Sequence, residues 1–275
     1  MPQERTRTEP TGNLVSIIIP TLNEERSLPT ALDSISSQTL RDYEVIVVDS
    51  GSVDRTGRLA HDFGAVMIDY PGKPMGARYE GLKHSRGSFI FHMDADQVLR
   101  PDTLERAMAA IKDRDMLVLE EVSYRPQGFL QRSIARQRLA LHQNVHGEDG
   151  IGPNLYPRFF RRGLLVEAYS SIPDSVLSKV FTYDDAFLFR KTHALSKKIG
   201  VLENAIMHIE EENWIAFMKH AYRTGRSAKS VGMVDLVGDL GRSETVVDRL
   251  KRAVRSRSLV VSSVKEFFFQ LGYRT

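Results

Sequence analysis

Short apolar runs alternate with amphipathic segments along the first 120 residues of the chain. Each run has four to six residues and stops at a proline or a polar residue, a pattern typical of strands that are buried on both faces. The predicted strands are residues 15–19, 44–49, 65–68, 89–92 and 116–120. Between these strands the apolar spacing predicts helices, of which the first opens at Ser27 and the others cover 54–63, 75–84 and 101–113.

Strands that alternate with helices predict an α/β fold with a mostly parallel, Rossmann-like sheet covered by helices on both faces. In such sheets, ligands bind beyond the carboxyl ends of the strands. The segments that follow four of the predicted strands are rich in carboxylates, small residues and turn formers, and they are residues 21–24, 49–52, 70–73 and 94–96. We therefore expect a functional cleft at this edge of the sheet.

Composition narrows the class of protein. The chain has 275 residues and no cysteine, which excludes a disulfide scaffold, thiolate catalysis and cysteine-ligated metals. No apolar run reaches the ~18 residues that a membrane-spanning helix needs. Residues 1–12 lack the apolar core of a secretory signal and are expected to form a flexible leader. A cytoplasmic protein, in contact with the inner face of the cell membrane or free of it, fits these features.

Basic charge is concentrated at the end of the chain. Residues 242–275 hold eight basic and three acidic residues, a net charge of +5, against +3 for the whole chain. Residues 231–275 are therefore expected to form a basic amphipathic helical tail, and no nucleic-acid partner is expected for the near-neutral body. The apolar stripe of this tail comprises Val247, Leu250, Val254, Val261, Val264, Phe268 and Leu271. The stripe predicts either peripheral contact with an anionic membrane or packing on the catalytic domain or another subunit.

Phosphate-binding loops of the common kinds are absent from the sequence. There is neither a GxxxxGK[ST] loop nor a GxGxxG loop, which disfavours P-loop hydrolases and dinucleotide oxidoreductases. The remaining candidate is Asp94-Ala95-Asp96, directly after the strand predicted at 89–92. Carboxylate oxygens suit Mg²⁺ or Mn²⁺, which bridge to phosphates. Such a pair also occurs by chance on surfaces, but its place at the ligand edge favours a site.

Four ordered segments resemble the signatures of family-2 glycosyltransferases with the GT-A fold. They read VSIIIPTLNEE (15–25), VIVVDSGSVDRT (45–56), GARYEGL (76–82) and MDAD (93–96). The resemblance is strong over residues 13–120, the nucleotide-sugar-binding half, and looser over residues 121–230, the acceptor-binding and catalytic half. It implies transfer of a sugar from a UDP- or GDP-sugar to an acceptor hydroxyl of a glycan or glycolipid, with inversion and with Mg²⁺ or Mn²⁺.

The resemblance also assigns roles to residues. Asp49 would accept a hydrogen bond from the base, Gly51 would let the backbone approach the nucleotide, and Lys73 and Arg78 would lie near the diphosphate. An alternative makes Asp49 and Asp54 helix caps. The full set of expected nucleotide-sugar-binding residues is Pro20, Thr21, Asn23, Glu24, Asp49, Gly51, Lys73, Arg78, Asp94, Ala95 and Asp96.

The second half resembles the acceptor side of the family. Residues 183–190, YDDAFLFR, resemble a Glu-Asp motif whose Asp is the general base. Alignment to Leu188 selects Asp185 as this base and alignment to Arg190 selects Asp184, and we favour Asp185. The alternative is two acids that a helix dipole stabilises.

Three further residues are candidates for ligand binding. In relatives, a His after a strand such as 205–208 completes the cation site, which makes His208 the third metal ligand beside Asp94 and Asp96. Arg158 and Arg161 are candidates for a phosphate-bearing acceptor, although surface salt bridges are the commoner explanation. The Gln-x-x-Arg-Trp motif of processive members is absent, which favours addition of a single sugar.

Two other functions remain open at this point. A polyprenyl-phosphate glycosyltransferase, similar to the dolichol-phosphate mannose synthases, would need no general base. A non-catalytic nucleotide-sugar-binding protein would need neither the paired acids of the second half nor His208.

Overall fold

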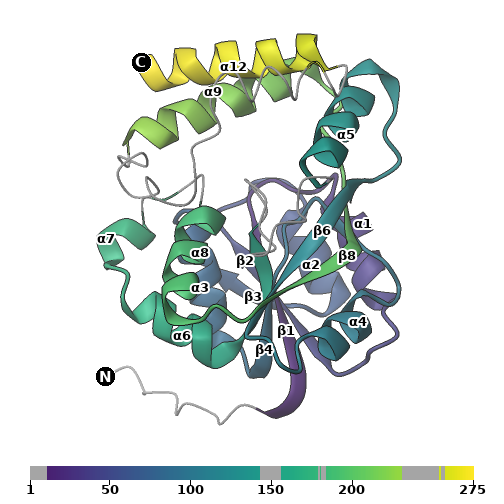
Figure 1. Cartoon of the computed structure of the whole chain (residues 1–275), viewed down its shortest axis with the longest axis vertical. Helices are drawn as coiled ribbons and strands as arrows, with labels where there is room; N and C mark the ends of the chain where they lie inside the picture. Colours follow the sequence, from purple (N-terminus) through teal and green to yellow (C-terminus); the bar gives the residue numbers. More distant parts are fainter. Residues whose placement is uncertain (1–10, 143–155, 179, 181–183, 231–253, 255–257) are drawn as a thin grey trace.

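The computed structural model describes residues 11–142, 156–178, 180, 184–230, 254 and 258–275 (Figure 1). These residues form a central sheet flanked by helices. The strands are β1 (Thr11–Thr21), β2 (Tyr43–Asp49), β3 (Val66–Asp69), β4 (Gly87–His92), β5 (Gln97–Leu99), β6 (Met116–Ser123), β7 (Pro157–Arg161) and β8 (Ile199–His208). The helices are α1 (Leu28–Ser36), α2 (Thr56–Phe63), α3 (Pro74–His84), α4 (Thr103–Ala110), α5 (Gly128–His142), α6 (Arg162–Ser170), α7 (Asp174–Leu177), α8 (Asp184–Leu195), α9 (Trp214–Ser230) and α12 (Leu259–Arg274).

The sheet is mostly parallel, as the sequence predicts. Its strand order is β3-β2-β1-β4-β7-β6-β8-β5. Strands β3, β2, β1 and β4 are parallel, with Ile17 of β1 opposite Val45 of β2 and Phe91 of β4. Strand β7 runs antiparallel to both of its neighbours, and β5 runs antiparallel to β8. The carboxyl ends of β1, β2 and β4 therefore meet at one edge, where β7 begins.

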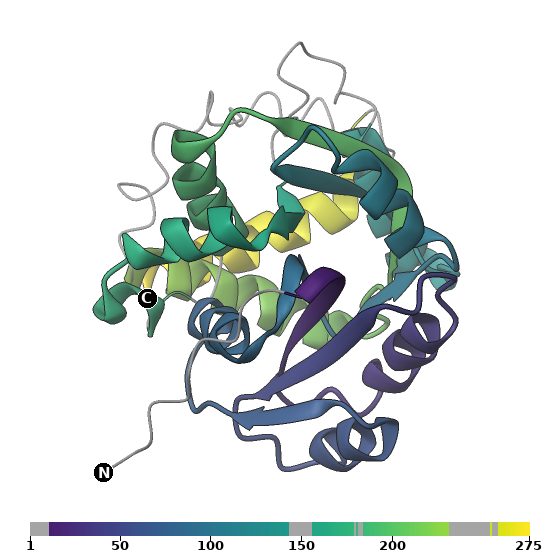
Figure 2. The same cartoon turned by 90° about the horizontal axis from the view of Figure 1, so that it is seen from below.

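Apolar side chains of the strands alternate between two cores. Ile17 and Ile19 of β1 pack toward α1, α2 and α4, whereas Ile18 packs toward α3, α6 and α8. Figure 1 shows these two helix groups on opposite sides of the sheet, and Figure 2 shows the same layers from below. Burial of each of these isoleucines contributes about 1.5–3 kcal/mol to folding.

Several element boundaries differ from the prediction. Strand β1 continues through Pro20 to Thr21, because β4 pairs with β1 only as far as Ile18 and the missing N–H of Pro20 leaves no ladder bond unmade. The same strand begins at Thr11, inside the predicted leader. Ser27 donates its hydroxyl hydrogen bond to the carboxylate of Glu24 instead of capping α1.

The described part of the tail packs on the rest of the chain. Helices α9 and α12 lie side by side beyond the carboxyl edge of the sheet (Figures 1 and 2). A Cβ atom built on Gly225 of α9 would lie 1.9 Å from the carbonyl oxygen of Phe269, and one on Gly272 of α12 would lie 2.0 Å from that of Tyr222. The two helix backbones therefore approach each other closely at these glycines, and α9 continues past Gly225 to Ser230.

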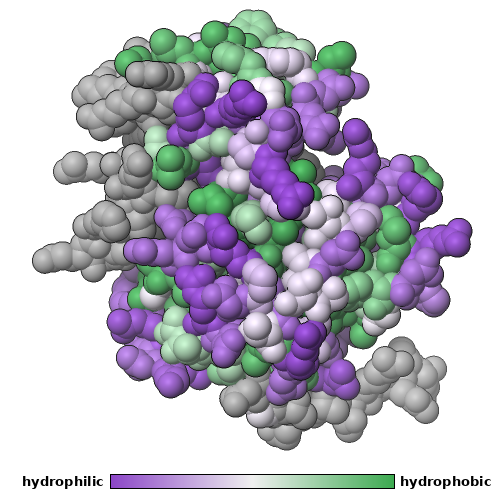
Figure 3. Space-filling model, turned by 90° about the vertical axis from the view of Figure 1, so that its right-hand side faces the viewer, coloured by the Kyte–Doolittle hydropathy of each residue, from purple (hydrophilic) through white to green (hydrophobic). Residues whose placement is uncertain are grey.

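The predicted apolar stripe is only partly buried by this packing. Val261 is fully buried and Val264 and Phe268 are half-buried, whereas Leu271 and Val254 are exposed. Val247 and Leu250 lie outside the described residues. Figure 3 shows hydrophobic surface at the end of the molecule that α12 forms, where Val260 and Phe267 are exposed. No helix among the described residues is long and apolar enough to cross a membrane.

Candidate functional site

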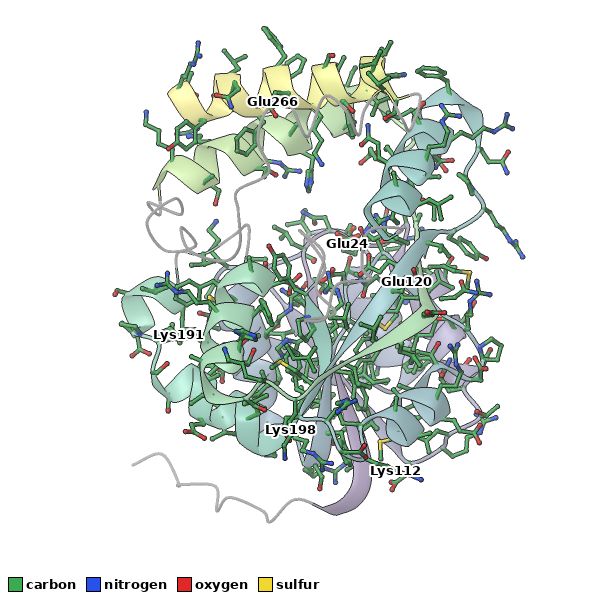
Figure 4. All side chains as sticks on the ribbon, viewed as in Figure 1. Glu24, Lys112, Glu120, Lys191, Lys198 and Glu266 are labelled. Atoms are coloured by element: carbon green, nitrogen blue, oxygen red, sulfur yellow. The ribbon has the colours of Figure 1, made fainter. Side chains whose placement is uncertain are left out.

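The predicted ligand edge gathers polar side chains from six elements. Strands β1, β2 and β4 end there, β7 begins there, β8 ends nearby, and α8 opens toward it. Figure 4 shows Glu24 at this edge, between the sheet and α9. Gly81 helps to position Arg78, because a Cβ at Gly81 would lie 2.4 Å from Cγ2 of Ile18, so that α3 lies close against the sheet.

Asp49 is held at the end of β2 by neighbouring donors. Its Oδ1 accepts hydrogen bonds from the hydroxyls of Thr21 at 3.0 Å and Ser52 at 2.5 Å, and its Oδ2 accepts one from the backbone N–H of Ser52 at 2.8 Å. Gly51 has a φ of +92°, which glycine adopts readily, and this turn brings Ser52 back to the carboxylate. Asp49 therefore organises a turn, and the predicted base contact would use the same carboxylate.

Asn23 and Glu24 lie against this turn. The side chain of Asn23, a non-glycine residue with a φ of +58°, accepts a hydrogen bond from the N–H of Val53 at 2.9 Å. Burial raises the pKa of Glu24, the Ser27 hydroxyl lowers it, and the carboxylates of Asp96 and Asp94 raise it further. Glu24 thus shares one electrostatic environment with the Asp94-Ala95-Asp96 segment. Asp54 is not the N-cap of α2, which is Arg55, but it lies just before it and its Oδ1 accepts the N–H of Thr56, the first residue of the helix, at 2.9 Å.

Arg78 joins the first half of the chain to the second. Its side chain is 4% exposed, and its two terminal nitrogens contact Asp94, at 2.5 Å, and Asp184. Arg158, at the start of β7, bridges Asp94 at 2.9 Å and Asp185 at 3.1 Å. Burial alone would raise the pKa of Asp94, but Arg158 and Arg78 outweigh burial and lower the pKa to about 2. These arginines keep Asp94 ionised.

The two predicted acceptor arginines lie in different places. Arg158 lies in the site and is paired with the carboxylates of Asp94, Glu121 and Asp185, as the salt-bridge alternative expects, and its role toward an acceptor phosphate stays a prediction. Arg161 lies opposite Phe89 at the other end of the sheet, where it donates hydrogen bonds to the carbonyl oxygens of Ile111, Lys112 and Arg114. Because Arg161 is far along β7 from the carboxyl edge, its contacts are those of a structural residue.

Asp184 and Asp185 both open α8, and they differ in environment. Burial raises the pKa of Asp184 to about 6, although Arg78 opposes this shift. Asp185 is slightly more exposed and lies between Arg158 and Arg78, whose nearest nitrogen is 4.0 Å away. The structure therefore brings both candidate bases next to Asp94, and both remain candidates on geometry alone.

Asp96 and His208 face each other across the site. Oδ2 of Asp96 lies 3.3 Å from Nε2 of His208, and burial raises the pKa of Asp96 while the imidazole lowers it. A carboxylate and an imidazole fit the donor preference of Mn²⁺. No three His, Cys, Asp or Glu side chains among the described residues converge as a metal cluster, so the pair would need oxygen ligands from a diphosphate or water.

Other site residues were not foreseen from the sequence. Glu121 of β6 accepts hydrogen bonds from Arg158 and Arg138, and burial raises its pKa while these arginines lower it overall. Gln97 accepts a hydrogen bond from the N–H of Asp94 and donates one to Glu121. Glu210 pairs with Arg138 at 2.8 Å. These partners are distant in sequence, and their residue types are ordinary on surfaces, so no local pattern marks them.

Lys73 and Ala95 also lie at this edge of the sheet. Lys73 lies in extended backbone immediately before α3, with Pro74 as the first helical residue. Ala95 is buried between the two aspartates. With these, every predicted nucleotide-sugar-binding residue falls at or beside the carboxyl edge.

Known proteins with similar sequences are glycosyltransferases. The family model for Glycosyl transferase family 2 matches residues 16–165. The chain is 32% identical over 171 residues to a PGL/p-HBAD biosynthesis glycosyltransferase of Mycobacterium bovis, a match covering 56% of this chain and 66% of that protein. It is 30% identical over 207 residues to the putative glycosyltransferase EpsH of Bacillus subtilis, covering 70% of this chain and 60% of that protein. The chain spans less than two thirds of either relative.

Solved structures share the fold. The S. aureus TarS fragment 1–349 in complex with UDP matches with a TM-score of 0.59 at 17% identity, over 93% of this chain and 91% of that chain. Glucosyl-3-phosphoglycerate synthase from Mycobacterium tuberculosis, in complex with Mn²⁺, UDP and glucosyl-3-phosphoglycerate, matches with a TM-score of 0.56 at 20% identity, over 82% and 81%. These likenesses confirm the predicted GT-A fold. Because the family model matches more than half of its residues, the chain belongs to glycosyl transferase family 2.

Proposed function

We propose that this protein transfers a single sugar, with inversion, from a UDP- or GDP-sugar to an acceptor hydroxyl of a glycan or glycolipid. The observation that carries the proposal is the convergence of Asp49, Asp94, Asp96 and Asp185 at one edge of the sheet. The fold neighbours support it, since one of them was crystallised with UDP and another with Mn²⁺ and UDP.

In this proposal each side chain has a distinct task. Asp49 orients the nucleotide base, and Glu24 lies beside it at the same edge of the sheet. Asp96 and His208 would hold Mg²⁺ or Mn²⁺, which when bound neutralises the diphosphate leaving group. Arg78 and Arg158 hold Asp94 and the two acids of α8 in place and add positive charge beside the diphosphate.

Asp185 removes the proton from the acceptor hydroxyl in this scheme. It is the more exposed of the two acids of α8, and Arg158 fixes its carboxylate next to Asp94. A base must be within hydrogen-bond reach of its proton, and the more exposed carboxylate has the better access to an acceptor. Asp184 supports it through Arg78.

Replacement of the base tests the proposal. Asp185→Asn should lower kcat by roughly 10²-fold or more while the Kd of the donor stays within about twofold, because the acceptor proton is lost only during chemistry. Turnover is measured by release of the nucleoside diphosphate. The matched control is Asp174→Asn, an exposed acid in the first turn of α7, which should leave kcat unchanged.

Two other outcomes would redirect the assignment. Full turnover in Asp185→Asn together with transfer to a polyprenyl phosphate would favour the polyprenyl-phosphate glycosyltransferase, whose acceptor needs no base. Tight nucleotide binding without transfer from any UDP- or GDP-sugar would favour a non-catalytic sensor. A thermal-shift panel of these sugars with and without Mn²⁺ identifies the donor, because a ligand that binds the native state raises the unfolding temperature.

Helix α12 of the predicted tail packs on α9, which favours packing on the catalytic domain over peripheral membrane contact as the role of its apolar stripe.

A further inference from the structure

Glu210 is a buried carboxylate that the proposed reaction does not use. It follows β8 by two residues and is 5% exposed. Backbone hydrogen bonds fix its surroundings: the N–H of Tyr124 donates to the carbonyl of His208 at 2.7 Å, and that of Ile209 donates to the carbonyl of Asp96 at 2.8 Å. The amide of Gln131 donates to the carbonyl of Glu210 at 2.8 Å. These hydrogen bonds therefore fix the backbone positions from which the side chains of His208 and Glu210 extend.

The two oxygens of the Glu210 carboxylate are used unequally. Oε1 accepts hydrogen bonds from the hydroxyl of Ser123 at 2.5 Å and from Nε of Arg138 at 2.8 Å. Oε2 accepts a long contact of 3.4 Å from Nη2 of Arg138. The same Oε2 lies 3.7 Å from Nδ1 of His208. Oε2 of Glu210 can therefore accept a further hydrogen bond, and it faces the imidazole.

The imidazole nitrogen on that side is a buried polar atom in need of a partner. Nδ1 of His208 makes no hydrogen bond to any residue that the structure describes. The other ring nitrogen, Nε2, faces Asp96. A nitrogen that binds a cation must be unprotonated, so the proton of a ligating His208 has to be on Nδ1, where a carboxylate stabilises it.

We propose that Glu210 is a positioning residue that accepts a hydrogen bond from Nδ1 of His208 and so presents Nε2, together with Asp96, to a divalent cation. This inference rests on the cation site of the proposed function. The present separation of 3.7 Å exceeds a hydrogen bond, so the Glu210 carboxylate and the imidazole would have to move closer together in the cation-binding state. The hydrogen bonds from Ser123 and Arg138 fix the Glu210 carboxylate beside His208.

The test compares cation affinity in matched variants. Free Mn²⁺ is followed by electron paramagnetic resonance during titration of the full chain with UDP, and in parallel with GDP. Glu210→Gln should weaken Mn²⁺ binding by roughly 10–100-fold, the range for partners of ligating histidines. Glu212→Gln makes the same exchange at an exposed acid two residues further on and should stay within about threefold of wild type.

A double variant separates positioning from general destabilisation. If Glu210 acts through His208, the variant His208→Ala/Glu210→Gln binds Mn²⁺ no more weakly than His208→Ala alone. Nitrogen-15 spectra of the imidazole in the complex with Mg²⁺ and UDP or GDP should show the proton on Nδ1 in wild type and a mixture of tautomers in Glu210→Gln. Should Glu210→Gln fail to fold, Glu210→Asp withdraws the carboxylate from Nδ1 and should give the same loss.

The results that would contradict the role of Glu210 differ from those that would contradict the proposed function. Wild-type Mn²⁺ affinity in Glu210→Gln, or losses that add in the double variant, would overturn the role of Glu210 alone. Absence of Mn²⁺-dependent nucleotide binding in wild type would overturn the cation site itself.

Discussion

Two buried arginines determine how the acidic residues of the site are arranged. Arg78 and Arg158 each contact Asp94 and one or both acids of α8, so carboxylates from separate parts of the chain share two cations. Buried charges that lose a partner are costly, because neither water nor a counter-charge replaces it. The ion pairs of Arg78 and Arg158 therefore contribute to the stability of the folded protein as well as to the site.

Removal of Arg78 should therefore destabilise the protein strongly. We expect Arg78→Met to lower the free energy of unfolding by about 3–5 kcal/mol, because the buried Asp184 loses its ion-pair partner and Asp94 is left with Arg158 alone. Urea denaturation measures the change. Arg58→Met, which breaks an exposed pair with Asp62 in α2, should cost less than about 0.5 kcal/mol. Equal losses in the two variants would contradict the argument.

The raised pKa of Asp184 predicts a pH-dependent stability. Its pKa is about 6 in the folded protein against 3.8 ordinarily, so the folded state favours the protonated acid. The resulting stabilisation is complete below pH 3.8 and is lost as the pH rises through about 6. Relative to wild type, Asp184→Asn should gain about 1–3 kcal/mol of stability between pH 4 and pH 7. A difference between the two proteins that does not change with pH would refute the shift.

Single residues show where sequence reasoning was limited. Asp94, Asp96, Asp185 and His208 were identifiable because motifs or strand ends mark them, and the structure places them together. The pairing of Arg158 with Asp94 could not be predicted, because Asp94 follows β4, Arg158 lies on the antiparallel neighbour β7, and the two are far apart in sequence. Glu210 belongs to a run of acids that is typical of a solvated segment, and only the fold buries it.

At the scale of elements, the best prediction was the parallel part of the sheet. Apolar runs bounded by turn residues identify β1, β2 and β4 because these strands are buried on both faces, and β3 is the more exposed edge strand of the same parallel set. The second half was harder, since β7 and β8 enter the sheet out of sequence order. The close contact of α9 with α12 is made at a glycine of each helix, which no periodicity within α9 reveals.

The contact of α9 with α12 depends on the absence of side chains at two glycines. Gly225→Ala places a Cβ within 1.9 Å of backbone, so we expect α12 to shift and the free energy of unfolding to fall by about 1–3 kcal/mol. Gly57→Ala in α2, which meets nothing within 4 Å, should instead gain up to about 1 kcal/mol. Hydrogen exchange of α12 amides should accelerate in the first variant. Unchanged exchange there would disprove the close contact.

The whole molecule combines a mostly parallel sheet with a second half that brings acidic and basic side chains to the same edge. Asp49 comes from β2, Asp94 from the end of β4, and Asp185 from α8, so donor binding and acceptor activation would occur within one network. Arg158 connects the two halves of that network directly.

Calorimetric titration of the protein with UDP- and GDP-sugars, with and without Mn²⁺, tests the central claim most directly. For one of these donors, wild type should bind at least about tenfold more tightly with Mn²⁺, and Asp96→Asn should abolish that gain while it leaves the cation-free affinity unchanged. Donor binding that is indifferent to both Mn²⁺ and the Asp96→Asn substitution would contradict the account.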